Sequence, residues 1–219
     1  MARPTLLIGN KNYSSWSLRA WLALEQTGIA FDEVRIALFK PGYQERIAQY
    51  SAAGKVPVLI DGDIHVWESL AILEYLAEKY PDKQLWPADA RERAYARSIS
   101  NEMHAGFTNL RSRMPMNIRG SHPGKGRTPE VLADIARIAA IWSDCRQRHA
   151  AHGPFLFGQF CNADAMYAPV AMRFITYAVE LPAPARDYVD ALGATPAIKK
   201  WRAAALAETE IIEEDEPYR

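Results

Sequence analysis

The chain has 219 residues, of which 49% are hydrophobic and 24% are charged, as expected for a globular protein that can bury a sizeable core. Its 26 basic and 26 acidic residues give a formal net charge of zero, so no global field attracts nucleic acid or an anionic membrane. We therefore expect neither kind of partner, and small-molecule chemistry fits the composition better.

The sequence has few targeting, metal or redox signals. No apolar run approaches the roughly 20 residues of a membrane span, and the first residues lack the apolar segment of a signal peptide, so we expect a cytoplasmic protein. Cys145 and Cys161 have no Cys-x-x-Cys spacing, which argues against a disulfide framework or a dithiol site. We expect no metal, because the close pair His149 and His152 has no cysteine or carboxylate to complete a ligand set.

The first 80 residues alternate between strand and helix patterns. Residues 5–8 form an apolar run typical of a buried strand, and apolar spacing after residue 13 predicts a helix that stops at Gly28. Residues 31–38 predict a second strand, and 44–48 predict a short helix. The layout is thioredoxin-like, and the helices between the strands predict parallel crossings among the first three strands.

Residues 54–76 are the most informative stretch. Pro57 begins a strand, a hairpin turn follows, and Glu68 and Ser69 stand where a helix begins. Because proline cannot donate to a sheet ladder, Val56 can present its backbone N–H and C=O to a bound peptide. A helix N-terminus favours an anionic group, and the Glu68 carboxylate could hold an ammonium. The pair would suit one amino acid's carboxylate and amine, or would simply begin the helix.

The rest of the chain has a different composition. Residues 81–88 are polar and bounded by prolines, and we interpret them as a linker. Alanine-rich segments beyond it predict helices at 88 to about 114, 129 to about 150, 163 to about 179, 183 to about 192, and 196 to about 206. We therefore predict one domain over 1–80 and an all-helical domain over 89–219. The acidic run at 208–216 predicts a solvated tail.

Hydroxyl groups cluster at the predicted start of the first helix, at Tyr13, Ser14, Ser15 and Ser17. A serine there usually caps the helix. A hydroxyl among free N–H groups can also stabilise a thiolate, because the helix dipole and a donated hydrogen bond both favour the charged form. Lowering a thiol pKa from about 8.5 by roughly two units makes most of it thiolate at neutral pH.

Together, the serines, Val56-Pro57 and Glu68-Ser69 resemble the cytosolic glutathione S-transferase superfamily, serine-type, with bacterial zeta-like and theta-like patterns. The resemblance covers the whole chain. It implies an α/β N-terminal thioredoxin-like domain plus an all-α C-terminal domain, glutathione as co-substrate, an electrophilic small molecule, no metal, a homodimer and a role in detoxification. In that family the Val-Pro segment, with a cis proline, pairs with the cysteinyl backbone of glutathione. The Glu/Gln-Ser pair holds its γ-glutamyl end.

The resemblance also implies roles for single residues. The zeta register assigns thiol activation to Ser14, and theta-like spacing to Arg19 assigns it to Ser15. We rank Ser14 first because of the Ser-Ser-x-Ser pattern. Tyr13 is a further candidate, since other classes use tyrosine. The glutathione-binding residues implied are Lys40, Lys55, Val56, Pro57, Glu68 and Ser69, in which the lysines would meet the glycine carboxylate.

The second substrate's pocket is implied on the helical half. Residues 104, 107, 108 and 111 share one face of the predicted helix. In the family this face overlooks the sulfur, so its candidates are His104, Phe107, Thr108 and Arg111. Tyr13 and Trp16, at the start of the first helix, complete the predicted pocket. Arg111 would favour an anionic or carbonyl-bearing substrate, or would form an interface ion pair. Cys161 and Asp164 occupy the family's capping box, with Asn162 as an alternative cap, so Asp164 is a folding residue.

These features predict a glutathione S-transferase that activates the glutathione thiol for attack on an electrophile. Two alternatives stay open. One is zeta-like, glutathione-dependent cis-trans isomerisation of a dicarboxylic enone, against which Trp16 counts because the zeta class has cysteine there. The other is a non-catalytic binding module of the same fold.

Overall fold

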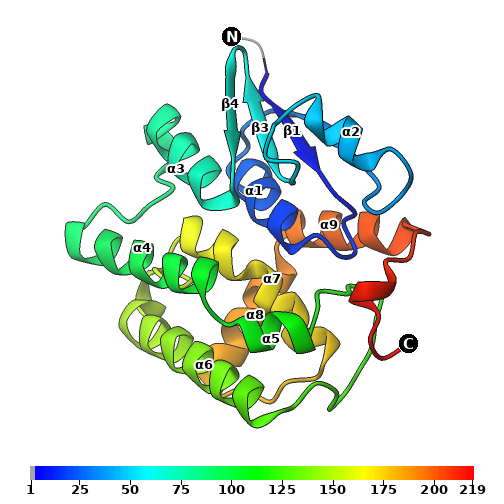
Figure 1. The fold of residues 1–219 in the computed structure, drawn as a ribbon. Coiled ribbons are helices and arrows are strands. Elements are labelled where there is room, and N and C mark those ends of the chain that lie inside the picture. The colour runs from blue at the N-terminus through cyan, green and yellow to red at the C-terminus, as the bar shows by residue number, and fades with distance from the viewer. Residues whose placement is uncertain (1–2) are drawn as a thin grey trace.

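The computed structural model describes residues 3–219, so residues 1 and 2 of the predicted first domain lie outside the described residues. The chain begins with a four-stranded sheet and its helices (Figure 1). In order, these elements are β1 (Thr5–Ile8), α1 (Ser15–Gln26), β2 (Asp32–Arg35), α2 (Tyr43–Ala48), β3 (Val58–Asp61), β4 (Ile64–Trp67) and α3 (Ser69–Lys79). The predicted α/β character of this half is confirmed.

The sheet has the strand order β2-β1-β3-β4 and mixed directions. β1 and β2 are parallel, as predicted, but β3 is antiparallel to β1, with Leu7 opposite Val58. The predicted parallel crossing is therefore wrong for β3. The connection from β2 contains only the six-residue helix α2, and β3 begins beside the end of the sheet at which β2 stops.

Alternation along the strands sends side chains to two faces of the sheet. Leu6 and Ile8 join the main core with α1 and α3, whereas Leu7 joins a smaller cluster with Ile47 of α2 and Val58. The site described below lies at the end of the sheet where β1 leads into α1.

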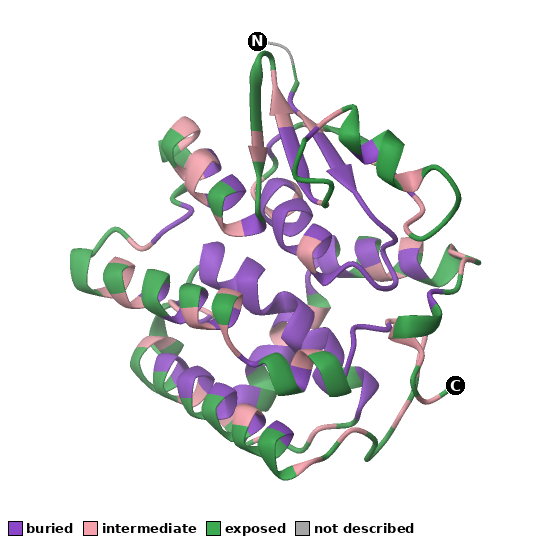
Figure 2. Ribbon diagram, viewed as in Figure 1, coloured by how far each residue is buried: buried purple, intermediate pink, exposed green. Residues whose placement is uncertain are grey.

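The second half of the chain is helical, as predicted. Its elements are α4 (Ala90–Ala105), α5 (Thr108–Arg113), α6 (Pro129–His149), α7 (Asn162–Thr176), α8 (Ala183–Ala194) and α9 (Pro196–Ala207). α7 is largely buried (Figure 2) and packs against α1, so the main hydrophobic core runs from the sheet into the helices without a break. The division into two domains with a linker at residues 81–88 stays a prediction. Within residues 3–219, no helix combines the length and apolarity needed to cross a membrane.

The helix predicted at 88 to about 114 is in fact two helices. Gly106 is extended and Phe107 has a left-handed backbone, with φ of 54°. Phe107 turns into the core, where it is 8% exposed, and the Asp134 carboxylate accepts the Leu110 N–H at 2.9 Å in the first turn of α5. The expectation of a single face carrying residues 104, 107, 108 and 111 is therefore wrong.

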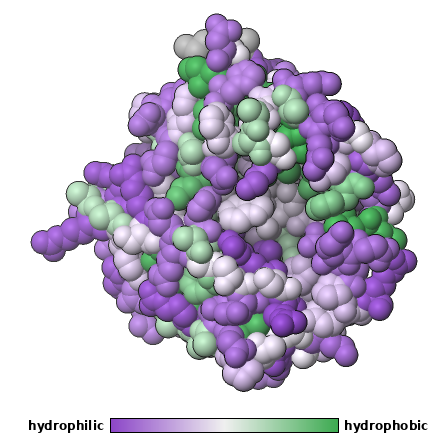
Figure 3. Space-filling view, in the orientation of Figure 1, coloured by the Kyte–Doolittle hydropathy of each residue, from purple (hydrophilic) through white to green (hydrophobic). Residues whose placement is uncertain are grey.

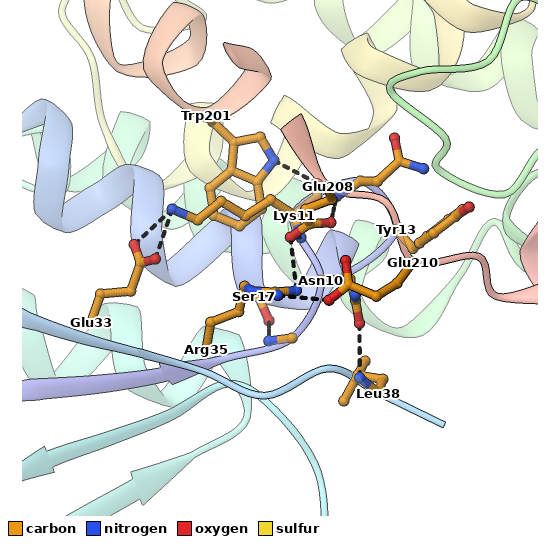
Figure 4. A network of polar contacts seen from close by, with 12 residues as sticks. Asn10, Lys11, Tyr13, Ser17, Glu33, Arg35, Leu38, Trp201, Glu208 and Glu210 are labelled. Atoms are coloured by element: carbon orange, nitrogen blue, oxygen red, sulfur yellow. Dashed lines mark hydrogen bonds and ion pairs between the residues drawn. The ribbon is translucent and has the colours of Figure 1, made fainter. Parts of the chain in front are cut away.

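The C-terminal segment, residues 208–219, is not a solvated tail. It lies against the loop between β1 and α1, where Glu208 accepts hydrogen bonds from the backbone N–H groups of Lys11 and Asn12 (Figure 4). Farther along, Ile212 is only 2% exposed. The predicted solvated tail is wrong because the run's carboxylates find backbone and arginine partners elsewhere in the chain.

The start of α7 has the capping arrangement that the sequence suggested. Asp164 accepts the N–H groups of Cys161 at 2.8 Å and Leu156 at 3.0 Å. Cys161 stays the N-cap, because the Asn162 side chain instead donates to the Leu73 carbonyl. Asp164 is therefore a folding residue that joins this helix to the preceding loop.

Candidate functional site

Two adjoining cavities open between the sheet half and the helical half. The first, of about 440 Å³, lies over the first turn of α1, and we call it the serine cavity. The second, of about 290 Å³, lies beside the start of α3, and we call it the Glu68 cavity. Figure 3 shows this face of the molecule hollowed between the two halves. The two cavities are neighbours, because they share four lining residues: Trp16, Lys55, Val56 and Arg111.

Ser14 and Ser15 both line the serine cavity, and Ser14 is the N-cap of α1. The Ser14 oxygen accepts the Ser17 N–H at 3.3 Å and lies 2.7 Å from the Ser17 hydroxyl oxygen. The Ser17 oxygen in turn accepts the Gly9 N–H at 3.0 Å. Ser14 therefore caps the helix and is also tied to the end of β1 through Ser17.

Ser15 has a charged partner. Its hydroxyl oxygen lies 3.4 Å from the Nη2 of Arg173, a buried arginine of α7 that also lines the serine cavity. The sequence analysis missed Arg173. The available signal was a lone cation in the otherwise apolar second half of α7.

The Tyr13 hydroxyl is occupied by other groups. It donates to Glu216 of the C-terminal segment at 2.6 Å and accepts from Arg119 at 2.8 Å. Burial and the Glu216 carboxylate raise the pKa of Tyr13, which opposes ionisation of this phenol. Tyr13 lines the serine cavity, while its hydroxyl holds the C-terminal segment.

Glu68 and Ser69 meet in the Glu68 cavity, at the start of α3. Glu68 has a φ of 67°, an uncommon backbone conformation for a residue other than glycine, of the kind that gathers at binding sites. The Ser69 side chain is buried, and its oxygen has no hydrogen-bond partner in the described part of the chain. A buried hydroxyl without a partner suits a site that awaits a polar ligand.

The Val56-Pro57 peptide bond is cis, as the resemblance implied. Val56 precedes the paired part of β3, whose first partners are Leu7 and Trp67, so it lies outside the sheet ladder. Lys55 is exposed and borders both cavities. Lys40 is exposed on the loop after β2, outside both linings, although the neighbouring Phe39 is part of one.

Trp16 lines both cavities, and two arginines lie over its ring. The ring centroid lies 4.2 Å from the Arg19 guanidinium carbon and 5.4 Å from that of Arg111, distances typical of cation–π contacts. His104 meets the ring edge-on at 5.3 Å and lies 3.8 Å from Glu68. Burial lowers the pKa of His104, with Glu68 opposing and both arginines adding to the effect, so we expect a neutral imidazole at pH 7.

The structure thus brings together most of the predicted residues, with two corrections on the helical half. Phe107 lies in the core and Thr108 is exposed at the start of α5, because the break at Gly106 rotates both away from the cavities. His104 and Arg111 keep their places. Asp215 of the C-terminal segment also lines the serine cavity, and the sequence analysis missed it.

No group of three or more His, Cys, Asp or Glu side chains that could hold a metal occurs within residues 3–219. The two cavities present hydroxyl groups, arginines, carboxylates and backbone groups.

Comparison with known proteins finds similarity to glutathione S-transferases and to maleylacetoacetate isomerases. The family model for the glutathione S-transferase N-terminal domain matches residues 13–79. A zeta-class glutathione S-transferase of Euphorbia esula is 28% identical over 75% of this chain and 71% of its own length. A maleylacetoacetate isomerase of Rattus norvegicus is 38% identical over 50% of this chain. The match covers 51% of that relative's own length.

Solved structures share the fold over nearly the whole chain. A glutathione S-transferase of the Antarctic clam Laternula elliptica aligns with a TM-score of 0.73 at 23% identity, covering 95% of this chain and 96% of that one. A glutathione transferase homolog from Burkholderia, with bound glutathione, aligns with a TM-score of 0.70 at 22% identity, covering 93% and 98%. This chain therefore contains a glutathione S-transferase N-terminal domain over residues 13–79, and its two parts together have the fold of the glutathione S-transferases.

Proposed function

We propose that this protein is a glutathione S-transferase, which binds glutathione in the Glu68 cavity and along Val56, and joins glutathione through its sulfur to an electrophile in the serine cavity. The observation that carries the proposal is that two adjoining cavities with shared lining residues bring together Ser14-Ser15, Val56-Pro57 and Glu68-Ser69, groups that are far apart in the sequence. The relatives named glutathione S-transferase support it.

Each part of glutathione has a matching protein group in this proposal. The Glu68 carboxylate holds the γ-glutamyl ammonium, and the buried Ser69 hydroxyl with the α3 N-terminus takes the adjacent carboxylate. Val56 offers its backbone to the cysteinyl unit, and Lys55 meets the glycine carboxylate. Lys40 is exposed on the loop after β2, and it would reach the glycine carboxylate only from that loop.

The chemistry follows from the hydroxyls at the start of α1. Loss of the thiol proton to water leaves a thiolate, and a serine O–H donates a hydrogen bond to it at the positive end of the helix. The sulfur then forms a bond to an electrophilic carbon, whose leaving group departs with the bonding electron pair. Trp16 and Arg111, at the junction of the cavities, border the space left for the electrophile.

A specific observation favours a second candidate, zeta-like isomerisation of an unsaturated dicarboxylate. Arg111 and Arg173 both line the serine cavity, where they suit a carboxylate-bearing substrate. The relatives named maleylacetoacetate isomerase agree with this candidate. Trp16 at the zeta cysteine position still opposes it. We also propose a cytoplasmic homodimer, which rests on the family.

Calorimetry with glutathione tests the binding site. The double variant Glu68→Ala/Ser69→Ala should weaken binding by about 2 kcal/mol or more, roughly thirty-fold, as expected for lost charged hydrogen bonds. Glu78→Ala is a matched control, because this carboxylate is exposed on the same helix α3 outside both cavities. Affinity in the double variant equal to that of the control would overturn the assignment.

Turnover separates the proposed activities. A chlorodinitrobenzene reports conjugation through release of chloride, and a cis-configured dicarboxylic enone reports isomerisation. Conjugation without isomerisation supports the transferase, and the reverse result supports the second candidate. Glutathione binding with no turnover of either probe would instead indicate a non-catalytic binding module.

A further inference from the structure

Arg173 has an unusual environment for a charged side chain. It is 4% exposed, within a helix whose neighbouring positions are almost all buried. Its Nε donates to the Met114 carbonyl at 2.8 Å and its Nη1 to the Pro169 carbonyl at 3.3 Å. The remaining nitrogen, Nη2, points to the Ser15 hydroxyl at 3.4 Å. Two carbonyls thus orient the guanidinium so that its third nitrogen faces the serine cavity.

The direction of the bond between Arg173 and Ser15 is determined by chemistry. A guanidinium carries only donors, so the Ser15 oxygen must be the acceptor. The Ser15 proton is then free to be donated elsewhere, and Ser15 lines the serine cavity. A bound thiolate at this position would accept that proton's hydrogen bond.

Ser14 differs from Ser15 in the charge behind it. Ser17 is completely buried and its oxygen already accepts the Gly9 N–H, so its proton is best used on Ser14. Ser14 therefore also has a proton to give, but both groups that donate to it are neutral. Hydrogen bonds that involve an ionised partner are roughly twice as strong as neutral ones. A cation one hydrogen bond away makes Ser15 the stronger donor toward an anion.

We infer that Ser15 donates the hydrogen bond that stabilises the thiolate. Arg173 is the positioning residue for Ser15, because its guanidinium orients and polarises the Ser15 hydroxyl. This inference rests on the proposed function and reverses the order of the two serines expected from the sequence pattern.

The charges around Arg173 are compatible with this role. Burial, together with Arg111 of α5, lowers the pKa of Arg173 to about 10, against the opposing effects of Asp215 and Tyr177. The guanidinium therefore stays protonated at pH 7. Burial raises the pKa of Asp215 to about 6, against the effect of Arg173. Arg19 of α1 is a second buried cation nearby, with its pKa lowered by burial, Arg173 and Arg111. The lining of the serine cavity thus contains two arginines, Arg111 and Arg173, beside the Asp215 carboxylate.

The test measures the thiol pKa of bound glutathione, from the thiolate absorbance against pH, in five variants. These are Ser14→Ala, Ser15→Ala, Arg173→Gln, Arg173→Lys and Ser15→Ala/Arg173→Gln. Ser100→Ala and Arg146→Gln are matched controls, because both residues are buried and bond to backbone carbonyls outside the two cavities. Circular dichroism and glutathione calorimetry accompany each measurement.

We expect Ser15→Ala and Arg173→Gln each to raise the bound-thiol pKa by about one unit or more, with glutathione affinity retained within about threefold. The double variant should raise it no further than the larger single effect, because both act through one hydroxyl. Arg173→Lys, which keeps the charge, should give an intermediate value. Ser14→Ala should give a smaller rise than Ser15→Ala.

Full additivity of the Ser15 and Arg173 shifts would overturn the inference, as would a thiol pKa that responds to Ser14→Ala and not to Ser15→Ala. If Arg173→Gln does not fold, Arg173→Lys and a further double variant, Ser15→Ala/Arg173→Lys, complete the cycle, and the Arg173→Lys shift must vanish when Ser15 is alanine. A wild-type protein that binds no glutathione refutes the proposed function. Tight binding with a low thiol pKa that ignores both residues refutes only this inference.

Discussion

Glu208 offers a sharp test of how the C-terminal segment supports the site. The Glu208 side chain is 6% exposed. Its carboxylate accepts hydrogen bonds from the backbone N–H groups of Lys11 at 2.7 Å and Asn12 at 3.0 Å. These residues belong to the loop that leads into the serines of α1, and Figure 4 shows the carboxylate above that loop. Arg35 adds an ion pair at 3.3 Å, and it retains Glu210 as a second partner.

Glu208→Ala removes the acceptor from two backbone N–H groups at once. A hydrogen bond to a charged group contributes about 1.5–3 kcal/mol, so the two together contribute about 3–6 kcal/mol. Water can enter the space that the side chain leaves, and the lower end, about 3 kcal/mol of unfolding free energy, is therefore expected. Glu208→Gln keeps one acceptor oxygen and should lose about half as much.

Equilibrium unfolding in urea measures both losses. Glu213→Ala is the matched control within the same segment, because that side chain is 79% exposed and its ion pair with Arg219 spans 3.6 Å, so we expect a change below about 0.5 kcal/mol. A Glu208→Ala protein as stable as this control, with an unchanged urea dependence, would refute the view that the C-terminal segment anchors the loop before α1.

Four other predictions can be tested, three of which follow from the contacts described above and one from the similarity to the family. Asp164→Ala leaves the Leu156 and Cys161 N–H groups without their acceptor, and urea unfolding should show a loss of about 2–5 kcal/mol, against almost none for the exposed Asp187→Ala. Burial raises the pKa of Asp164 from 3.8 to about 6, so the folded state holds this proton more tightly and the contribution of this group is lost as the pH rises through about 6. The deficit of Asp164→Asn should therefore shrink between about pH 4 and pH 7, and a growing deficit would contradict that sign. Tyr13→Phe should leave the bound-thiol pKa near that of the wild type, because its hydroxyl is committed to Glu216 and Arg119, and a rise of about one unit would make Tyr13 the activator. Light scattering after size exclusion should give about twice 24.6 kDa, and a clean monomer at micromolar concentration would exclude the homodimer.

Local patterns in the sequence were sufficient for most of the elements and for half of the site. Strand alternation, the proline before β3 and the hydroxyl cap before α1 act over a few residues, so β1, α1, α2 and the helices after α5 lie close to where they were expected. Val56-Pro57 and Glu68-Ser69 are neighbours in the chain, and each pair has its chemistry within one turn or strand. For these features the sequence itself contains the physical cause.

The remaining features depend on contacts between distant parts of the chain. The direction of β3 depends on where a long connection returns, and the break at Gly106 depends on a core that receives Phe107 and on Asp134 from another helix. The acidic C-terminal run reads as a solvated tail until its carboxylates meet backbone N–H groups at the other end of the chain. Arg173 is one cation in an apolar helix, and only the packing of α7 against α1 brings it to Ser15. A buried charge takes its role from its partners, and those partners are assembled by the tertiary structure.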